Sequence, residues 1–247
     1  MTSTNDIQWK RIAAEGVAIV VSILLAFGIE AWWQDRNDVN REQHLLTALL
    51  LEFEQNGELL RQAREVYEQY YRDALRVLEV MEEDPDTIDV AELEGLVGSL
   101  LARQTFHLES GALDGLLASG EMSLIRDAML RNRLAAWPSY AREWSEEEEA
   151  VFELVEESLV PYLSGLMRLR NVNRTFPPFP DGQAPPPIPA GSHETASLAS
   201  LVASTEFDNL VYLKANGTWH AMRDGETLRA QLTAIIQLIK QNLDNQL

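Results

Sequence analysis

The sequence predicts an all-α protein, with one N-terminal transmembrane helix followed by a helical-bundle domain. Three observations predict this fold class: an apolar run at residues 12–33, a long stretch in which apolar residues recur every three or four positions, and no window with sustained period-two alternation. We divide the 247 residues into a short tail at 1–11, the transmembrane helix at 12–33 and an acidic all-helical extramembrane domain at 34–247. Nothing between Trp33 and Asn37 ends a helix, so the transmembrane helix can continue into a long helix of the domain.

The transmembrane prediction depends on length and on the residues at the two borders. Uncharged sequence covers only the 14 residues from Gly16 to Ile29, and the flanks out to Ile12 and Trp33 supply the length of about 20 residues that a span needs. Interfacial anchors are expected at both borders, and the candidates are Trp9, Trp32 and Trp33. A secretory signal peptide is the competing interpretation, because basic residues precede the run, but no A-x-A cleavage site leads into a polar mature start.

Two carboxylates and a row of small residues give this helix candidate contact features. Glu15 and Glu30 are 15 positions apart, roughly 22 Å along a helix, so each would lie just inside a hydrocarbon core about 30 Å thick. Either both side chains reach headgroups or water, or they face a partner helix or a polar pathway. The small residues recur at every fourth position: Ala14, Ala18, Ser22 and Ala26. This spacing lets helix backbones approach closely in lipid.

Composition narrows the classes of partner and of chemistry. The formal net charge of −19 argues against a nucleic-acid partner, because phosphates are bound by clustered lysine and arginine. The same charge argues against a domain that lies flat on an anionic lipid surface. The chain has no cysteine, which excludes disulfides, thiolate nucleophiles and cysteine-ligated metal sites. We expect no cofactor.

One long helix is predicted from Asn37 to about Met81. Its apolar or small residues follow the spacing of a coiled-coil-like seam for about five heptads, and Asn56 interrupts the seam with a polar side chain. The seam positions are Leu46, Leu49, Phe53, Leu60, Ala63, Tyr67, Tyr70, Ala74, Val77 and Met81. We expect this stalk to pack against the later helices, because those helices need a surface to cover.

Shorter helices are predicted to follow the stalk. Turns are expected at 84–86 and at Ser119–Gly120, where glycine is a good C-terminal stop. The expected helices cover 91–103 and 111–118, and a helical run over 123–125 and 127–137 then reaches Pro138, which we expect to interrupt it.

The C-terminal part is predicted to contain two more helices and an irregular connection. Ser145 and Glu148 have capping-box spacing, which predicts a helix start there. Residues 171–193 contain FPPFP and APPPIP, and we interpret them as a proline-rich loop that connects helices, with a ligand for a partner as the alternative. The last helix is expected to begin at Ser204–Thr205 and to extend to the end of the chain.

No motif in the sequence indicates catalysis or metal binding. The histidines have no H-x-x-H or HExxH spacing, and the chain has no GxSxG, P-loop or post-strand GxGxxG. We expect the acidic run Glu146–Glu149 to be a solvated helix start rather than a calcium site. An enzyme built from scattered carboxylates and His107 or His220 is a further alternative. It would require a pocket that holds two or more such groups with perturbed pKa values.

Two sets of residues form a combined pattern. The first is the glutamate-led span, with Glu15, Ile23–Ala26, Trp33 and Arg36. The second is a motif of the form L-x-x-SG, a short spacer, LI and then LR: Leu116, Ser119, Gly120, Leu124, Ile125, Leu130 and Arg131. In both sets the sequence resembles a family of bacterial single-span membrane proteins of unknown function. The resemblance covers most of the chain and implies a single-pass protein of the bacterial inner membrane. The family brings no known activity.

These observations predict a membrane-anchored structural or interaction protein. We expect its partners to be the membrane and either a second copy of the chain or another integral membrane protein, so that it is an oligomer or an accessory subunit of a larger membrane complex. Lys10 and Arg11 before the span favour a cytoplasmic N-terminus and a periplasmic domain. The alternative is an oligomer that conducts or gates ions or protons through Glu15 and Glu30.

Overall fold

The computed structural model describes residues 4–84, 87–172, 188–189, 191 and 200–245, and all the regular structure in these ranges is helical. The elements are α1 (Thr4–Met81), α2 (Val90–Leu100), α3 (Gly111–Ser119), the 3-10 turn η2 (Glu121–Leu124), α4 (Ala128–Leu154), the π-helical turn η3 (Val155–Leu159), α5 (Val160–Leu166), α6 (Leu169–Val172) and α8 (Thr205–Asp244). The predicted all-α fold class is therefore confirmed.

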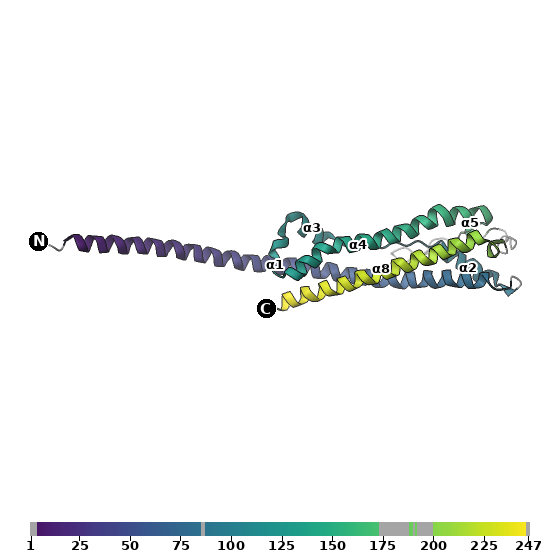
Figure 1. Cartoon of the computed structure of the whole chain (residues 1–247), viewed down its shortest axis with the longest axis horizontal. Helices are drawn as coiled ribbons and strands as arrows, with labels where there is room; N and C mark the ends of the chain where they lie inside the picture. The colour runs from purple at the N-terminus through teal and green to yellow at the C-terminus, as the bar shows by residue number, and fades with distance from the viewer. Residues whose placement is uncertain (1–3, 85–86, 173–187, 190, 192–199, 246–247) are drawn as a thin grey trace.

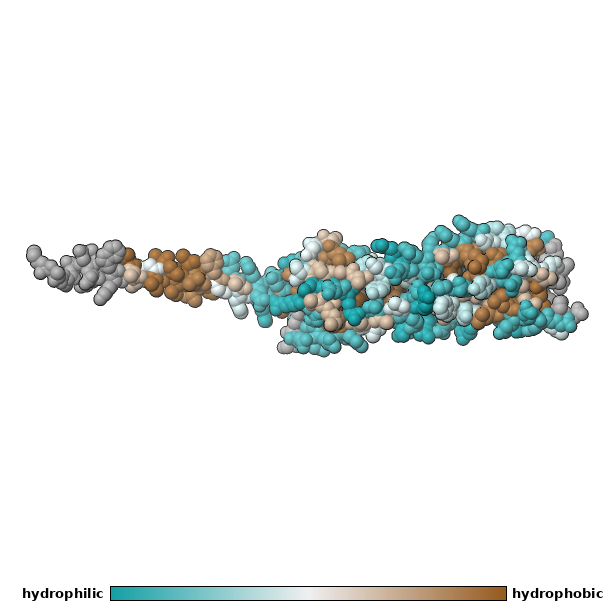
Figure 2. Space-filling model, in the orientation of Figure 1, coloured by the Kyte–Doolittle hydropathy of each residue, from teal (hydrophilic) through white to brown (hydrophobic). Residues whose placement is uncertain are grey.

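The helix α1 is the axis of the molecule, and it is continuous from the apolar N-terminal part into the bundle (Figure 1). We call residues 12–33 the apolar segment. This segment projects from one end of the bundle as a bare helix, and it forms the compact hydrophobic band of Figure 2. Among the described residues, α1 is the one helix long and apolar enough to cross a membrane, and none of its most apolar window is buried.

Three long elements form the bundle. The C-terminal part of α1 packs against α8, and α8 packs against α4 (Figure 1). Glu54 of α1 pairs with Lys240 of α8, whereas Arg64 pairs with Glu226, so the two helices are antiparallel. The helix α2 returns along α1 at the distal end of the bundle. The C-terminus of α8 therefore lies at the end nearest the apolar segment.

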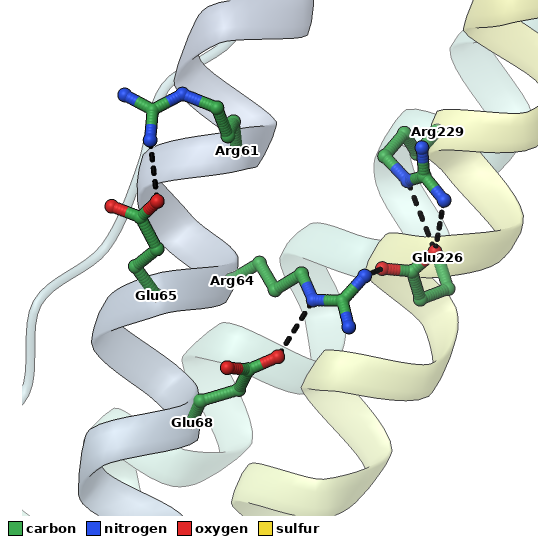
Figure 3. A network of polar contacts seen from close by, with 6 residues as sticks. All are labelled: Arg61, Arg64, Glu65, Glu68, Glu226 and Arg229. Atoms are coloured by element: carbon green, nitrogen blue, oxygen red, sulfur yellow. Dashed lines mark hydrogen bonds and ion pairs between the residues drawn. The ribbon is translucent and has the colours of Figure 1, made fainter.

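Figure 3 shows the ionic network that accompanies the contact between α1 and α8. Arg64 bonds to Glu68 on its own helix at 2.7 Å and to Glu226 on α8 at 2.5 Å, and Glu226 also pairs with Arg229 at 2.8 Å. All these side chains are substantially exposed, so solvent screens them and the network contributes to the register of the helices more than to stability.

The bundle interior contains two hydrophobic clusters. The proximal core, nearer the apolar segment, joins Leu46 to Tyr67 of α1 with Trp137 and Trp144 of α4 and with Leu228 to Ile239 of α8. The distal core joins the end of α1 with α2, the η3–α5 region and the start of α8. The predicted seam of α1 is confirmed at most positions: Leu46, Leu49, Phe53, Asn56, Leu60, Ala63, Tyr67, Ala74 and Val77 are buried, and Tyr70 and Met81 are half-buried.

Several local predictions are confirmed by the helix ends. Gly120 adopts the left-handed conformation, with φ of 72°, and ends α3 directly after Ser119. The side chain of Ser204 accepts a hydrogen bond from the Phe207 N–H at 3.2 Å and caps α8. Residues 85–86 of the expected turn and most of the proline-rich loop at 171–193 lie outside the described residues, and the Thr87 N–H donates to the Asp84 carbonyl at 2.8 Å.

Two predictions about the middle of the chain are wrong. The helix α4 continues through Pro138, because buried Leu134 and Trp137 before it and buried Trp144 after it fix one helical path by packing. Ser145 is not a helix start, because Asp127 caps α4 through bonds from the Met129 and Leu130 N–H groups. Local capping signals cannot distinguish a helix start from a helix interior once tertiary packing stabilises the longer helix.

Candidate functional site

The apolar segment presents all of its predicted contact residues to the outside. Ala14, Ala18, Ser22 and Ala26 are exposed, and the Ser22 hydroxyl donates to the Ala18 carbonyl at 2.8 Å. The hydroxyl is therefore satisfied within its own helix, and the row remains free for a neighbouring helix.

The border residues of this segment differ in their surroundings. Glu15 forms an ion pair with Arg11, one turn earlier on the same helix, at 3.2 Å. Glu30 is exposed, and Trp32 and Trp33 are 64% and 68% exposed. The helix includes Trp9, whose side chain lies outside the description. An ion pair at the N-terminal border is the arrangement expected for an interfacial carboxylate.

Polar contacts attach the turn between α3 and α4 to α1 immediately after the apolar segment. The Arg126 guanidinium bonds to the Asp35 carboxylate at 2.5 Å, and the Arg126 N–H donates to the buried carboxylate of Glu42 at 2.7 Å. Arg41 forms an ion pair with Glu121 of η2. These contacts therefore attach the bundle to α1 directly after the apolar segment. Figure 1 shows α3 and the start of α4 at the end of the bundle from which the N-terminal part of α1 projects.

The residues of the family-like motif build this turn. Leu116, Ile125 and Leu130 are buried in the proximal core, and Leu124 is half-buried. Ser119 and Gly120 form the stop of α3. Arg131 donates to the carbonyl of Ile125 at 2.5 Å and to that of Arg126 at 3.0 Å. Each motif residue thus has a structural role in the turn, and the structure brings all seven together.

Residues 102–110 form a non-helical segment that connects α2 to α3 and runs along the bundle. Tyr67 of α1 donates to the Gln104 carbonyl at 3.2 Å, and Asn56 of α1 bonds to Glu109. Asn56 and Tyr67 are 11 positions apart, which is about 16 Å along a helix. Their partners Gln104 and Glu109 are five positions apart, so the segment advances about 3.3 Å per residue, as a strand does. The segment is therefore extended. We call it the extended segment.

Buried polar side chains of α1 and α8 hold the extended segment and the start of α3. Asn56 donates to the Glu109 carbonyl and accepts from the Glu109 N–H, both at 2.7 Å. Glu52 accepts from the N–H groups of Ala112 and Leu113, so it caps α3 where Ser110 does not. Lys214 of α8 donates to the Ala102 carbonyl at 2.8 Å. The helix α2 ends at Leu100, three residues before the predicted end at Arg103.

Glu148 and Lys214 form the centre of a polar cluster where the two cores meet. The Tyr67 hydroxyl donates to Glu148, and the Phe106 N–H donates to the same carboxylate at 3.4 Å. Burial raises the pKa of Glu148 to about 7, although both hydrogen bonds oppose this shift. Burial, together with the nearby Arg103, lowers the pKa of Lys214 to about 7. The Lys214 ammonium also lies over the Tyr70 ring, 5.4 Å from its centroid.

This polar cluster surrounds a very small cavity. Its volume is about 10 Å³, and its lining includes Tyr67, Tyr70, Glu148 and Lys214. Such a space holds about one water molecule. Neither His107 nor His220 lines it. The hydrogen bonds of Glu148 and Lys214 attach the extended segment to α4 and α8.

No family model, curated protein or solved structure matches this chain. The resemblance to the single-span family stays a prediction. In the part of the chain that the structure describes, no group of three histidine, aspartate or glutamate side chains could hold a metal ion.

Glu148 and Lys214 are the residues that the sequence reasoning missed. Glu148 was expected in a solvated acidic run, yet it is 5% exposed, and Lys214 is fully buried. The burial of both residues could have been predicted from their helical spacing to apolar residues. Glu148 follows Trp137 and Trp144 at helical intervals, and Lys214 lies between Val211 and Thr218 in the same way, so both occupy the buried face of an apolar stripe.

Proposed function

We propose that this protein is a single-pass membrane-anchored interaction protein whose helical bundle docks on a second copy or on another integral membrane protein. The observation that carries the proposal is the exposure of the apolar segment on every side of α1. Such a surface is unfavourable in water at about 25 cal/mol per Å², and a bilayer removes this cost. In this proposal the chain has no catalytic role and binds no cofactor.

The length of the apolar segment supports a span. Residues 12–33 extend about 33 Å as a helix, close to the hydrocarbon thickness of about 30 Å. The charges of Lys10 and Arg11 support a cytoplasmic N-terminus, and the family resemblance supports the bacterial inner membrane, with the bundle in the periplasm.

The continuity of α1 supports an interaction role. Because the helix has no break between the apolar segment and the bundle, a helix that packs on one part constrains the orientation of the other. The small-residue row at Ala14, Ala18, Ser22 and Ala26 supplies a face suited to close helix packing in lipid.

The ion-conducting alternative receives less support. The pairing of Glu15 with Arg11 satisfies one of the two carboxylates that this role needs. We expect the double variant Glu15→Gln/Glu30→Gln to leave proton and cation flux into liposomes unchanged. A flux that the wild type carries and the variant loses would replace our proposal with this alternative.

The test is a native complex in gently solubilised membranes. We expect the chain to migrate above its monomer mass of 27.9 kDa plus detergent. Because the chain has no cysteine, single cysteines can carry a photoreactive maleimide. Ala18→Cys and Ser22→Cys probe the small-residue row, and Val20→Cys and Leu24→Cys, about half a turn away, are the matched controls. A monomer without cross-links that favour one face contradicts the proposal.

A further inference from the structure

The bundle carries an open groove of about 300 Å³ between the extended segment, the start of α3 and the middle of α4. Trp137, Trp144 and Leu113 lie at its buried side. Its walls are residues 106–110 on one side and Pro138, Ala141 and Ser145 on the other. This volume is in the range of ligand-binding clefts, and it greatly exceeds the cavity at Glu148.

The wall formed by the extended segment has main-chain groups without hydrogen bonds to the described residues. The Phe106 N–H donates to Glu148 and therefore faces α4. In extended backbone, residues two apart direct their main-chain polar groups to the same side, so we expect the N–H and C=O of Leu108 to face α4 as well. No hydrogen bond of the described part of the chain uses these two groups of Leu108. Main-chain groups placed in this way can pair with an added peptide strand.

The rim of the groove is acidic. Glu109 and Asp114 line it, and the Ser110 hydroxyl donates to Asp114 at 2.7 Å, which orders that carboxylate. His107 is the one basic side chain in the lining, and the chain as a whole has a net charge of −19. A ligand with positive charge is therefore electrostatically complementary to this rim.

We propose that the groove binds a short extended segment of a partner protein. In the bound state the main chain of that segment pairs with Leu108, an apolar side chain covers Pro138 and Ala141, and a lysine or arginine reaches Glu109 and Asp114. This inference rests on the proposed docking function and names the chemistry of the partner. Successive side chains of an extended peptide point to opposite sides, so the groove would favour a peptide in which basic and apolar residues alternate.

Fluorescence anisotropy with the full chain in detergent micelles tests this inference. The probes are fluorescein-labelled peptides that alternate basic and apolar residues: GKVKVKVG, GKLKLKLG, GRIRIRIG and GKFKFKFG. We expect at least one probe to bind, and we expect Ala141→Trp, which fills the groove, to weaken that binding at least tenfold. Ala150→Trp, at an exposed position of the same helix outside the groove, is the matched control and is expected to bind as the wild type does.

Two further arms separate groove binding from attraction to the net charge. In the first arm, the probe peptide is N-methylated at alternate main-chain nitrogens, in two versions that differ by one position. We expect one version to lose binding and the other to keep it, because only alternate N–H groups of an extended peptide face Leu108. This arm requires no variant of the protein. Glu109→Gln/Asp114→Asn is expected to weaken binding several-fold. The inference is overturned if no probe binds, or if Ala141→Trp and Ala150→Trp bind equally while circular dichroism shows both folded. If the probes fail but the native complex and the face-specific cross-links are found, the anchoring role stands without this groove.

Discussion

At the scale of single residues, the buried polar side chains act on the main chain of the connection between α2 and α4. Glu42, Glu52, Asn56, Glu148 and Lys214 are buried, and each bonds to a main-chain group between Ala102 and Arg126. Main-chain groups that leave a helix and enter a protein interior must find partners there. These side chains supply the partners, and so they fix the path of the connection.

Replacement of Asn56 by alanine is expected to lower the free energy of unfolding by about 2–4 kcal/mol. The variant leaves both the N–H and the C=O of Glu109 without this partner. A fully buried unsatisfied group costs about 1–3 kcal/mol, and because these two bonds are only partly buried, we expect about 1–2 kcal/mol for each. Urea unfolding followed by tryptophan fluorescence measures the change. Gln55→Ala, at the exposed neighbouring position, is the control and should change stability by less than about 0.5 kcal/mol. Equal effects of the two variants would show that the hydrogen bonds between Asn56 and Glu109 contribute little to stability.

The stability of the bundle is expected to decrease between pH 4.5 and pH 7 because of Glu148. Its pKa rises from 4.5 to about 7 on folding, so the folded protein binds more protons than the unfolded chain in this interval. The stabilisation by this group is complete below pH 4.5 and is lost as the pH rises through 7. Its size is about 3 kcal/mol at most.

The variant Glu148→Gln isolates this contribution, because it keeps an acceptor for Tyr67 and Phe106 but does not titrate. Unfolding curves at several pH values should show a smaller decrease for the variant than for the wild type. If the two proteins follow parallel curves from pH 4.5 to 7, Glu148 titrates normally in the folded state.

At the scale of elements, close packing decides where the long helices continue. The helix α8 continues through Gly217, where a Cβ atom would lie 2.9 Å from Val151 Cγ2 of α4. Glycine is unfavourable inside a helix, but here it allows the two helices to approach. Pro138 is retained within α4 for a related reason, because the tryptophans on both sides of it are buried in one core.

Two glycine-to-alanine variants are expected to change stability in opposite directions. Gly217→Ala should destabilise the bundle by about 1–2 kcal/mol, because its methyl group would displace the Val151 side chain at the half-buried contact between α8 and α4. Gly95→Ala, in α2 with no atom within 4 Å of the new Cβ, should stabilise it by up to about 1 kcal/mol. Thermal unfolding by circular dichroism compares them, and a stabilising Gly217→Ala would contradict the close contact.

At the scale of the whole molecule, α1 joins an exposed apolar segment to a packed bundle. Every residue of the apolar segment is exposed among the described residues, and the bundle has its own two cores. The segment and the bundle should therefore respond separately to substitution, although α1 makes them mechanically continuous.

The double variant Val20→Arg/Leu24→Arg is expected to lose membrane attachment. Each arginine near the centre of a span costs about 2.5–3.5 kcal/mol for insertion. Alkaline carbonate extraction should release the variant and retain the wild type in the pellet. The unfolding midpoint of the bundle should stay unchanged, and Gln34→Arg, just beyond the apolar segment, should remain in the pellet. Retention of the double variant would contradict the proposed span.

The sequence alone was sufficient for the all-α class, for the helical nature of both parts of α1, for α3 with its stop at Gly120 and for the start of α8 at Ser204, and it allowed the two parts of α1 to be continuous. These are local properties, because apolar periodicity and capping residues act within a few positions along the chain. The apolar segment is likewise a property of composition.

Only the tertiary structure decided which polar residues are buried and where the middle helices begin and end. Glu148 reads as part of a solvated acidic run, and Ser145 reads as a cap, until α1 and α8 cover that turn of α4. The path of the extended segment, and hence the groove beside it, likewise depends on contacts with Asn56, Tyr67, Glu148 and Lys214. The physical reason is that burial depends on residues that are distant in sequence, whereas periodicity and capping are set by neighbours.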